Sequence, residues 1–182
     1  GWLIGDGTFS VNKKGFDQPH IDLWIPSSMN IDDYVPAQVL NKFASRLNSR
    51  SDFNGFCLAS EKRNVKKYRM TCVAMAEVAQ KYGIKRLEKK VFESGSFEYS
   101  KGLLQGFFDT DGTIVGDVNK GISVRLGQTE LERLKAVQRL LFLMGICSVI
   151  YKNRVKAGMR LMPDGKGGQK EYMCKSMHEL IL

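Results

Sequence analysis

The chain has 182 residues, a length that allows one sizeable hydrophobic core or two small ones. Hydrophobic residues make up 43% of it and aromatic residues 10%, which excludes a disordered chain, and no apolar run is long enough to span a membrane. The formal net charge of +9 favours a polyanionic partner, although many soluble proteins are mildly basic without binding one.

The cysteines form no Cys-x-x-Cys pair, and their neighbours are largely apolar. They are Cys57, Cys72, Cys147 and Cys174. We therefore predict reduced thiols in the core of an intracellular protein, with no zinc site. No signal peptide is visible, and the compartment stays open.

The chain opens with Gly-Trp-Leu-Ile-Gly-Asp-Gly-Thr at residues 1–8. An apolar pair followed by Asp6 and Gly7 predicts the last turn of a buried helix, with the Asp6 carboxylate at its C-terminal tip. Because the chain begins inside this helix, we expect a longer protein to supply its start. A strand should follow over residues 8–11, and then a turn over 13–15.

Residues 20–25 alternate between two faces of a predicted strand. Ile21, Leu23 and Ile25 form the apolar face, which should lie on the core. The other face should meet solvent or a ligand. It carries His20, Asp22 and Trp24.

The rest of the first half predicts two helices and two strands. They are a helix over residues 33–47, strands over 55–60 and 67–73, and a helix over 75–82. Asp32 is the predicted N-cap of the first helix, and Gly83 ends the second. The linker at 84–97 carries two pairs of basic residues.

The second half predicts the same order of elements. A helix capped by Ser100 should end at Asp111. A Thr-x-x-Glu capping box at residues 129–132 should start another helix, which ends at Gly145. The expected strands cover 113–115, 121–126, 147–156 and 171–175, with a flexible glycine-rich tip at 163–168.

Alternation also assigns faces to these strands. Ile122, Val124 and Leu126 should face inward, and Gln128 should lie nearer the exposed side. In the next strand one face is basic. It carries Lys152, Arg154 and Lys156.

The two halves contain one repeated motif. Residues 104–113, Leu-Gln-Gly-Phe-Phe-Asp-Thr-Asp-Gly-Thr, align with the opening residues so that Asp111 follows Asp6 by 105 positions. Late in the repeats the offset falls to 102, and residues 177–180 align with the start of the helix predicted at 75–82. We therefore predict an α+β fold of two pseudo-symmetric repeats, residues 1–98 and 99–182, with the second shortened at its C-terminus.

Residues 104–112 resemble the nine-residue signature of the LAGLIDADG homing endonucleases, with Gln105 and Thr110 as departures. The opening copy matches the signature from its third position onward. Both copies are similar to those of the subgroup found in inteins, and the likeness covers essentially the whole chain. The resemblance implies a monomer with internal pseudo-twofold symmetry. Its two αββαββα repeats would meet through their motif helices and bind double-stranded DNA on antiparallel sheets.

Small residues on the predicted motif helices would let the helices approach closely. They are Gly1, Gly5, Gly102 and Gly106. Such packing places the carboxylates of Asp6 and Asp111 side by side, and two carboxylates about 4 Å apart repel by roughly 4 kcal/mol at an effective dielectric constant near 20. The negative ends of the helix dipoles add to the repulsion. A divalent cation removes it, and oxygen ligands suit Mg²⁺.

A metal ion between two such acids suits phosphodiester hydrolysis, because it lowers the pKa of the attacking water and stabilises the leaving oxygen. The resemblance implies that each acid serves the cut of one strand and that the backbone carbonyls of Gly5 and Thr110 are further ligands. It also implies that Mn²⁺ can replace Mg²⁺, and that Ca²⁺ supports binding without cleavage. The family places a basic residue near the water. Position before the second motif favours Lys90, with Lys89 as the near alternative, although Phe92 replaces the usual proline.

A twisted antiparallel sheet can place outward side chains in the major groove of DNA and its edges on phosphates. Each basic residue alone is more often a solvated surface charge, but the set lies on predicted sheet faces in both halves. The predicted DNA-binding residues are Lys13, Lys14, His20, Asp22, Trp24, Lys67, Arg69, Arg125, Lys152, Arg154 and Lys156.

No other catalytic set competes, because His20 and His178 have no nucleophile at an interpretable spacing. We therefore predict a Mg²⁺-dependent homing endonuclease that hydrolyses both strands of a long DNA target, and the resemblance implies that it leaves 3′ overhangs. It would be the endonuclease domain of an intein, a protein-splicing element. A second interpretation is a protein of the same fold that binds without cleaving, either a DNA-binding regulator or an RNA-binding intron maturase. The presence of both Asp6 and Asp111 favours the nuclease, since a pure binder gains nothing from paired acids.

Overall fold

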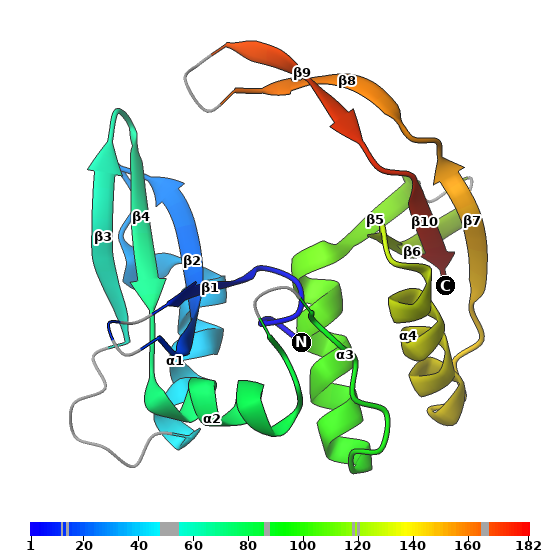
Figure 1. The fold of residues 1–182 in the computed structure, drawn as a ribbon, viewed down its shortest axis with the longest axis horizontal. Helices are drawn as coiled ribbons and strands as arrows, with labels where there is room; N and C mark the ends of the chain where they lie inside the picture. The colour runs from blue at the N-terminus through cyan, green and yellow to red at the C-terminus, as the bar shows by residue number, and fades with distance from the viewer. Residues whose placement is uncertain are drawn as a thin grey trace. The chain divides into compact units, whose positions relative to one another are not determined.

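The computed structural model describes most of the chain, and its chain trace divides into two compact units (Figure 1). The described residues are 1–11, 13, 15–47, 55–85, 88–117, 119, 121–164 and 168–182, without the side chains of 43–47. The N-terminal unit is Trp2–Lys90, and the C-terminal unit is Val91–Leu182 together with Gly1. No helix in the described part of the chain has the length and hydrophobicity needed to span a membrane.

The N-terminal unit contains one antiparallel sheet with the strand order β1-β2-β4-β3. Its elements are β1 (Gly7–Val11), β2 (Asp17–Pro26), the 3₁₀ helix η1 (Ile31–Asp33), α1 (Val35–Leu47), β3 (Phe56–Lys62), β4 (Val65–Met70) and α2 (Val73–Lys81). The side chain of Asn30 accepts a hydrogen bond from Asp32 N, so Asn30 caps η1 and the predicted N-cap role of Asp32 is wrong.

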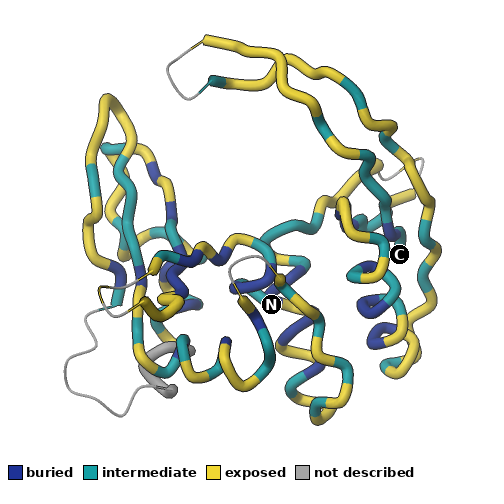
Figure 2. Tube along the Cα trace, in the orientation of Figure 1, coloured by how far each residue is buried: buried dark blue, intermediate teal, exposed yellow. Residues whose placement is uncertain are grey.

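The core of this sheet follows the predicted alternation on β2 (Figure 2). Ile21, Leu23 and Ile25 are buried, and α2 covers β2. The other face differs from the prediction at His20, which is only 2% exposed and therefore does not face solvent. Trp24 on the same face is 62% exposed, as predicted.

The opening residues form turns and not the predicted helix. Leu3 and Ile4 are buried, as expected for the apolar pair, and Gly7 N donates to the carbonyl oxygen of Trp2 at 3.0 Å. A hydrogen-bonded turn therefore carries Asp6 to the start of β1.

The C-terminal unit has a four-stranded sheet with the order β5-β6-β10-β7 and a separate hairpin of β8 and β9. Its elements are α3 (Phe97–Asp111), β5 (Gly112–Asp117), β6 (Gly121–Gln128), α4 (Leu131–Leu143), β7 (Val149–Val155), β8 (Gly158–Pro163), β9 (Gln169–Cys174) and β10 (Met177–Ile181). Figure 1 shows β8 and β9 extending beyond β7 and β10.

The four-stranded sheets have one topology, which confirms the repeated α+β fold. Leu126 pairs with Leu180 across β6 and β10 as Ile21 pairs with Met70 across β2 and β4. Met177–Ile181 is thus a strand equivalent to β4, and its predicted alignment with the last helix of the first repeat is wrong. The reason is the extra β8–β9 hairpin, which raises the offset to 110 positions between Met70 and Leu180.

Several local predictions of the second half are also wrong. The N-cap of α3 is Ser96, whose Oγ accepts from Tyr99 N at 3.2 Å, while Ser100 is buried one turn inside the helix. The Thr-x-x-Glu sequence forms no capping box, since α4 has Glu130 at its N-cap without a side-chain hydrogen bond. Ile122 is 63% exposed and does not face inward.

The prediction that the cysteines lie in the core is wrong. Cys57 and Cys147 are exposed, and Cys72 and Cys174 are half-buried; all are free thiols. Among the described residues there is no group of three or more His, Cys, Asp or Glu side chains that could hold a metal ion.

The glycine after each motif acid meets the same steric restriction. A Cβ added to Gly7 would lie 2.3 Å from the carbonyl oxygen of Leu3, and one added to Gly112 would lie 2.2 Å from that of Phe108. Real Cβ atoms do not approach an oxygen so closely, and backbone cannot shift cheaply to make room. The Asp-Gly pair is therefore a packing requirement in both units.

Replacing Gly112 by alanine is expected to lower the free energy of unfolding by about 1–3 kcal/mol, because the added methyl collides with backbone. Gly102→Ala in α3 is the matched control, since a Cβ there meets nothing within 4 Å. Alanine should stabilise that exposed helix position by up to about 1 kcal/mol. Urea unfolding followed by circular dichroism measures both changes. A Gly112→Ala protein as stable as the parent would contradict the steric account.

Candidate functional site

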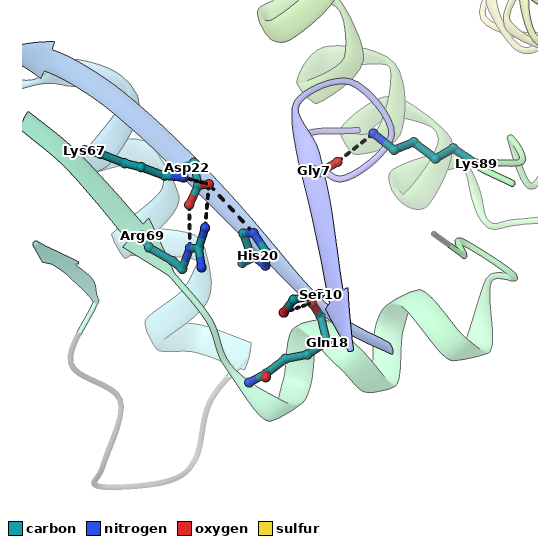
Figure 3. Close-up of polar contacts among 8 residues, drawn as sticks. All are labelled: Gly7, Ser10, Gln18, His20, Asp22, Lys67, Arg69 and Lys89. Carbon is teal, nitrogen blue, oxygen red and sulfur yellow. Dashed lines mark hydrogen bonds and ion pairs between the residues drawn. The ribbon is translucent and has the colours of Figure 1, made fainter. Parts of the chain in front are cut away.

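The turn around Asp6 is lined by a lysine from the end of the N-terminal unit. Asp6 is exposed, and Lys89 Nζ donates to the carbonyl oxygens of Gly5 at 3.0 Å and Gly7 at 2.7 Å. Figure 3 shows the Gly7 contact. An antiparallel bridge between Ile84 and Lys89 fixes this placement. The positively charged ammonium group of Lys89 therefore lies at the two carbonyls that flank Asp6.

The neighbouring lysine is placed differently. The Lys90 side chain is 69% exposed, and its Nζ pairs with Glu88 Oε1 at 2.8 Å. Of the two candidates for the basic residue, Lys89 is the one that contacts the backbone beside Asp6.

The donor set at Asp6 fits a hard divalent cation. The carbonyl of Gly5, predicted as a metal ligand, already accepts from the ammonium group of Lys89. A carboxylate and neighbouring carbonyl oxygens are the ligands that Mg²⁺ and Ca²⁺ take, with water completing the shell. The chemistry of this turn therefore suits an oxygen-ligated ion.

The acid of the C-terminal unit has a different partner. Gln128 Nε2 donates to Asp111 Oδ2, and Gln128 Oε1 accepts from Arg133 Nη1 at 2.8 Å. Arg133 Nη2 in turn donates to Glu130 Oε2 at 2.9 Å. Gln128 is only 8% exposed, so its predicted position nearer the exposed side is wrong. Because Arg133 holds Gln128 Oε1, the amide is oriented with its Nε2 donor toward Asp111.

Sequence reasoning missed the roles of Gln128 and Arg133. Their only local signal is the placement of a polar residue at the end of a strand and a basic residue in the first turn of the next helix. Thr110 lies at the end of α3, where its Oγ1 donates back to the carbonyls of Gly106 and Phe107 at 3.2 and 3.0 Å. Because Asp6 and Asp111 belong to different units, their pairing stays a prediction.

The polar face of the N-terminal sheet is organised around Asp22 (Figure 3). Arg69 Nε and Nη2 donate to its two oxygens at 2.7 and 2.9 Å, and Lys67 Nζ lies 2.7 Å from Oδ2. Burial alone would raise the pKa of Asp22, but the hydrogen bonds and charges of Arg69 and Lys67 outweigh it and lower this pKa. Lys67 also lies over the Trp24 ring at 4.9 Å from its centroid.

His20 lies beside this cluster with its Nε2 3.7 Å from Asp22 Oδ2. Burial lowers the pKa of His20, and the charge of Arg69 lowers it further against the opposing effect of Asp22. The imidazole is therefore neutral at pH 7.

The C-terminal sheet also has one carboxylate between two basic side chains. Glu179 Oε2 lies 3.6 Å from Arg125 Nη1 and 3.5 Å from Arg154 Nε. The strict alternation predicted for β7 is interrupted. The register of β7 with β10 shifts between Val155 and Tyr151, and Asn153 has a φ of 51°. Lys13, Lys152 and Lys156 are exposed, and Lys14 lies outside the described residues.

Residues 98–182 match the family model described as LAGLIDADG-like domain. The fold is similar to that of the homing endonuclease I-DmoI. A structure of its mesophilic variants shares 13% identity and a TM-score of 0.55, with 99% of this chain and 83% of that chain covered. The complex of I-DmoI with DNA and Ca has 14% sequence identity and a TM-score of 0.57, with 99% of this chain and 78% of that chain covered. The chain therefore contains a LAGLIDADG-like domain at residues 98–182.

The chain is also similar in sequence to parts of two much longer proteins. It is 32% identical over 118 residues, 62% of this chain and 11% of the relative, to the ribonucleoside-diphosphate reductase NrdEB subunit alpha of Bacillus subtilis (strain 168). It is 36% identical over 89 residues, 49% of this chain and 9% of the relative, to the ribonucleoside-diphosphate reductase large subunit of Invertebrate iridescent virus 6. The chain thus spans about a tenth of the length of these curated relatives.

The Asp22 cluster makes the stability of this protein depend on pH. The folded pKa of Asp22 lies below its unfolded value, so the stabilisation is present above the ordinary carboxyl pKa and is lost as the pH falls below it. Asp22→Asn should lower the free energy of unfolding by about 1–3 kcal/mol at neutral pH.

Urea unfolding of parent and variant from about pH 7 to about pH 3 measures this difference. The difference between the two proteins should shrink toward the acid end. A difference that stays constant over the whole range would show that Asp22 stabilises the fold by packing and not by its charge.

Proposed function

We propose that this chain is a site-specific DNA endonuclease that cuts both strands of a long duplex target. The observation that carries the proposal is the recurrence of one acid, followed by a glycine that packing requires and then by a strand, in two units whose sheets share a strand order. One acid in each unit matches one cut in each strand. I-DmoI, whose fold this chain shares, has been solved in complex with its target DNA.

Each acid would work with groups of its own unit. Asp6 with the Gly5 carbonyl, and Asp111 with the Thr110 carbonyl, would hold a divalent cation that supplies a water of lowered pKa and stabilises the leaving oxygen. Lys89 is our assignment for the basic residue, because its ammonium group lies beside Asp6 and can donate to a water or a phosphate oxygen there. Donation from Gln128 fixes the orientation of the Asp111 carboxylate.

Mg²⁺ is the cofactor we propose, with Mn²⁺ as a replacement and Ca²⁺ supporting binding alone. The oxygen ligands fit all three ions. The structures of I-DmoI with DNA include Ca and Mn complexes, and one was formed in the presence of Mg.

We further propose that the endonuclease belongs to an intein inserted in a ribonucleotide reductase. The similarity to reductase subunits is confined to about a tenth of their length, as expected for an inserted element. The DNA that joins the reductase coding sequences on the two sides of such an insertion is then the target to test.

Lysine variants separate the two candidates for the basic residue. With that duplex and Mg²⁺, Lys89→Met should reduce the cleavage rate by about 10²-fold or more, because a donor to the reacting groups is lost. Lys90→Met is the matched control and should cut at close to the parent rate. Rates are measured from labelled duplex on denaturing gels. The reverse order of the two variants would overturn the Lys89 assignment.

The same experiment distinguishes the rival function. Parent protein that binds the duplex in Ca²⁺ but leaves it intact in Mg²⁺ and Mn²⁺ would be a non-cleaving DNA-binding protein. Preference for RNA over this duplex would favour a maturase.

DNA binding should depend strongly on salt. If about eight basic side chains contact phosphates, the logarithm of the affinity falls with the logarithm of the salt concentration with a slope near −7, because condensed counterions are released. Fluorescence anisotropy in Ca²⁺ at several salt concentrations measures the slope. A slope close to zero would remove the basic sheet faces from the binding surface.

A further inference from the structure

Asp22 holds one edge of the Arg69 guanidinium group, which is a planar fork of N–H donors (Figure 3). Arg69 Nε donates to Asp22 Oδ1 at 2.7 Å, and Arg69 Nη2 donates to Oδ2 at 2.9 Å. Two parallel hydrogen bonds of this kind hold the guanidinium plane in place. The Asp22 side chain is 10% exposed and that of Arg69 is 37% exposed, so the acid is covered while the arginine stays accessible.

The other edge of the fork takes no part in this pair. Nη1 and the second hydrogen of Nη2 present two parallel N–H donors on the side of Arg69 away from Asp22. Guanine presents two adjacent acceptors, O6 and N7, in the major groove, and a bidentate arginine contact to them is the commonest specific contact in protein–DNA complexes.

Cross-strand neighbours hold the pair on one face of the sheet. Arg69 is opposite Asp22 and Lys67 is opposite Trp24 in the β2–β4 register. Lys67 Nζ also lies 2.7 Å from Asp22 Oδ2, so the acid is fixed by two basic groups. The arginine is therefore oriented before any partner binds, which reduces the entropy lost on binding.

Charge favours a base over a phosphate as the partner of Arg69. Asp22 offsets the positive charge of Arg69, and His20 adds none, because burial keeps its pKa low. Attraction to phosphate depends on net positive charge, whereas recognition of a base edge depends on fixed donor geometry. In this cluster Lys67 supplies the remaining positive charge, and Arg69 supplies N–H donors in a fixed orientation.

We propose that Arg69, positioned by Asp22, recognises one guanine in the major groove of the target DNA. The inference rests on the proposed function, because it assigns a base to the DNA-binding face of the N-terminal sheet. It makes Arg69 a specificity-determining residue and Asp22 a positioning residue.

The described residues of the C-terminal sheet form no such fork. Glu179 lies at 3.6 and 3.5 Å from Arg125 and Arg154, each through a single nitrogen. Neither arginine is held in a two-bond fork with Glu179, so the guanine contact belongs to one half of the target. The two halves of the DNA site should therefore differ.

Selection of bound duplexes from a randomised double-stranded DNA library, in Ca²⁺ and followed by sequencing, tests the proposal. The parent should enrich guanine at one position by about 5- to 150-fold over the other bases. Arg69→Gln should change the preference at that position alone from guanine to adenine, because glutamine matches the N6 and N7 groups of adenine. Asp22→Asn should weaken the guanine preference at the same position.

Two further variants control for folding and for charge. Arg69→Lys keeps the positive charge and the partner of Asp22, and it should lose the guanine preference while total DNA binding stays near the parent value. Lys13→Gln, an exposed residue of the same unit, should weaken all sequences alike. Uniform weakening by both Arg69 variants, or unchanged guanine enrichment, would overturn the guanine contact. A parent protein that enriches no sequence would overturn site-specific binding itself.

Discussion

A carbonyl oxygen four residues before each Asp-Gly glycine excludes a side chain at that glycine, and the rest of each unit depends on this contact. In the N-terminal unit the oxygen belongs to Leu3, and in the C-terminal unit it belongs to Phe108. Because the glycine has no Cβ, the chain can leave the turn directly into the first strand of a sheet. The acid before it then lies at the start of the sheet, after a turn in the N-terminal unit and at the end of α3 in the C-terminal unit. The glycine therefore couples the packing of the fold to the position of the candidate catalytic group.

Both sheets combine a basic face with one partly buried carboxylate. Asp22 and Glu179 each lie between two basic side chains, and without them those side chains would repel one another. A carboxylate in a DNA-binding surface lowers the attraction to phosphate, but it fixes the direction of its partners. Such a surface gives up some non-specific affinity and gains orientation, which is what selection of one site among many requires.

Periodicity predicted the elements and their order, because alternating and helical patterns reflect burial on one face. It failed where another part of the chain decides the outcome. Alternation on β2 placed His20 on the open face, yet neighbouring groups cover it. Because of the β8–β9 hairpin, β10 occupies the place equivalent to β4, whereas the sequence offset had aligned its residues with a helix. The contact from Gln128 to Asp111 spans 17 positions, and the contacts of Lys89 with Gly5 and Gly7 span 84 and 82, so local patterns could not decide these partners.

Strand-resolved cleavage tests most directly the claim that each unit supplies one acid for one strand. The target duplex, labelled differently on its two strands, is incubated with Mg²⁺ and with Asp6→Asn or Asp111→Asn protein. Each variant should still bind in Ca²⁺, and each should lose the cut in one strand, a different strand for each variant. Undiminished cutting of both strands by both variants would contradict the account.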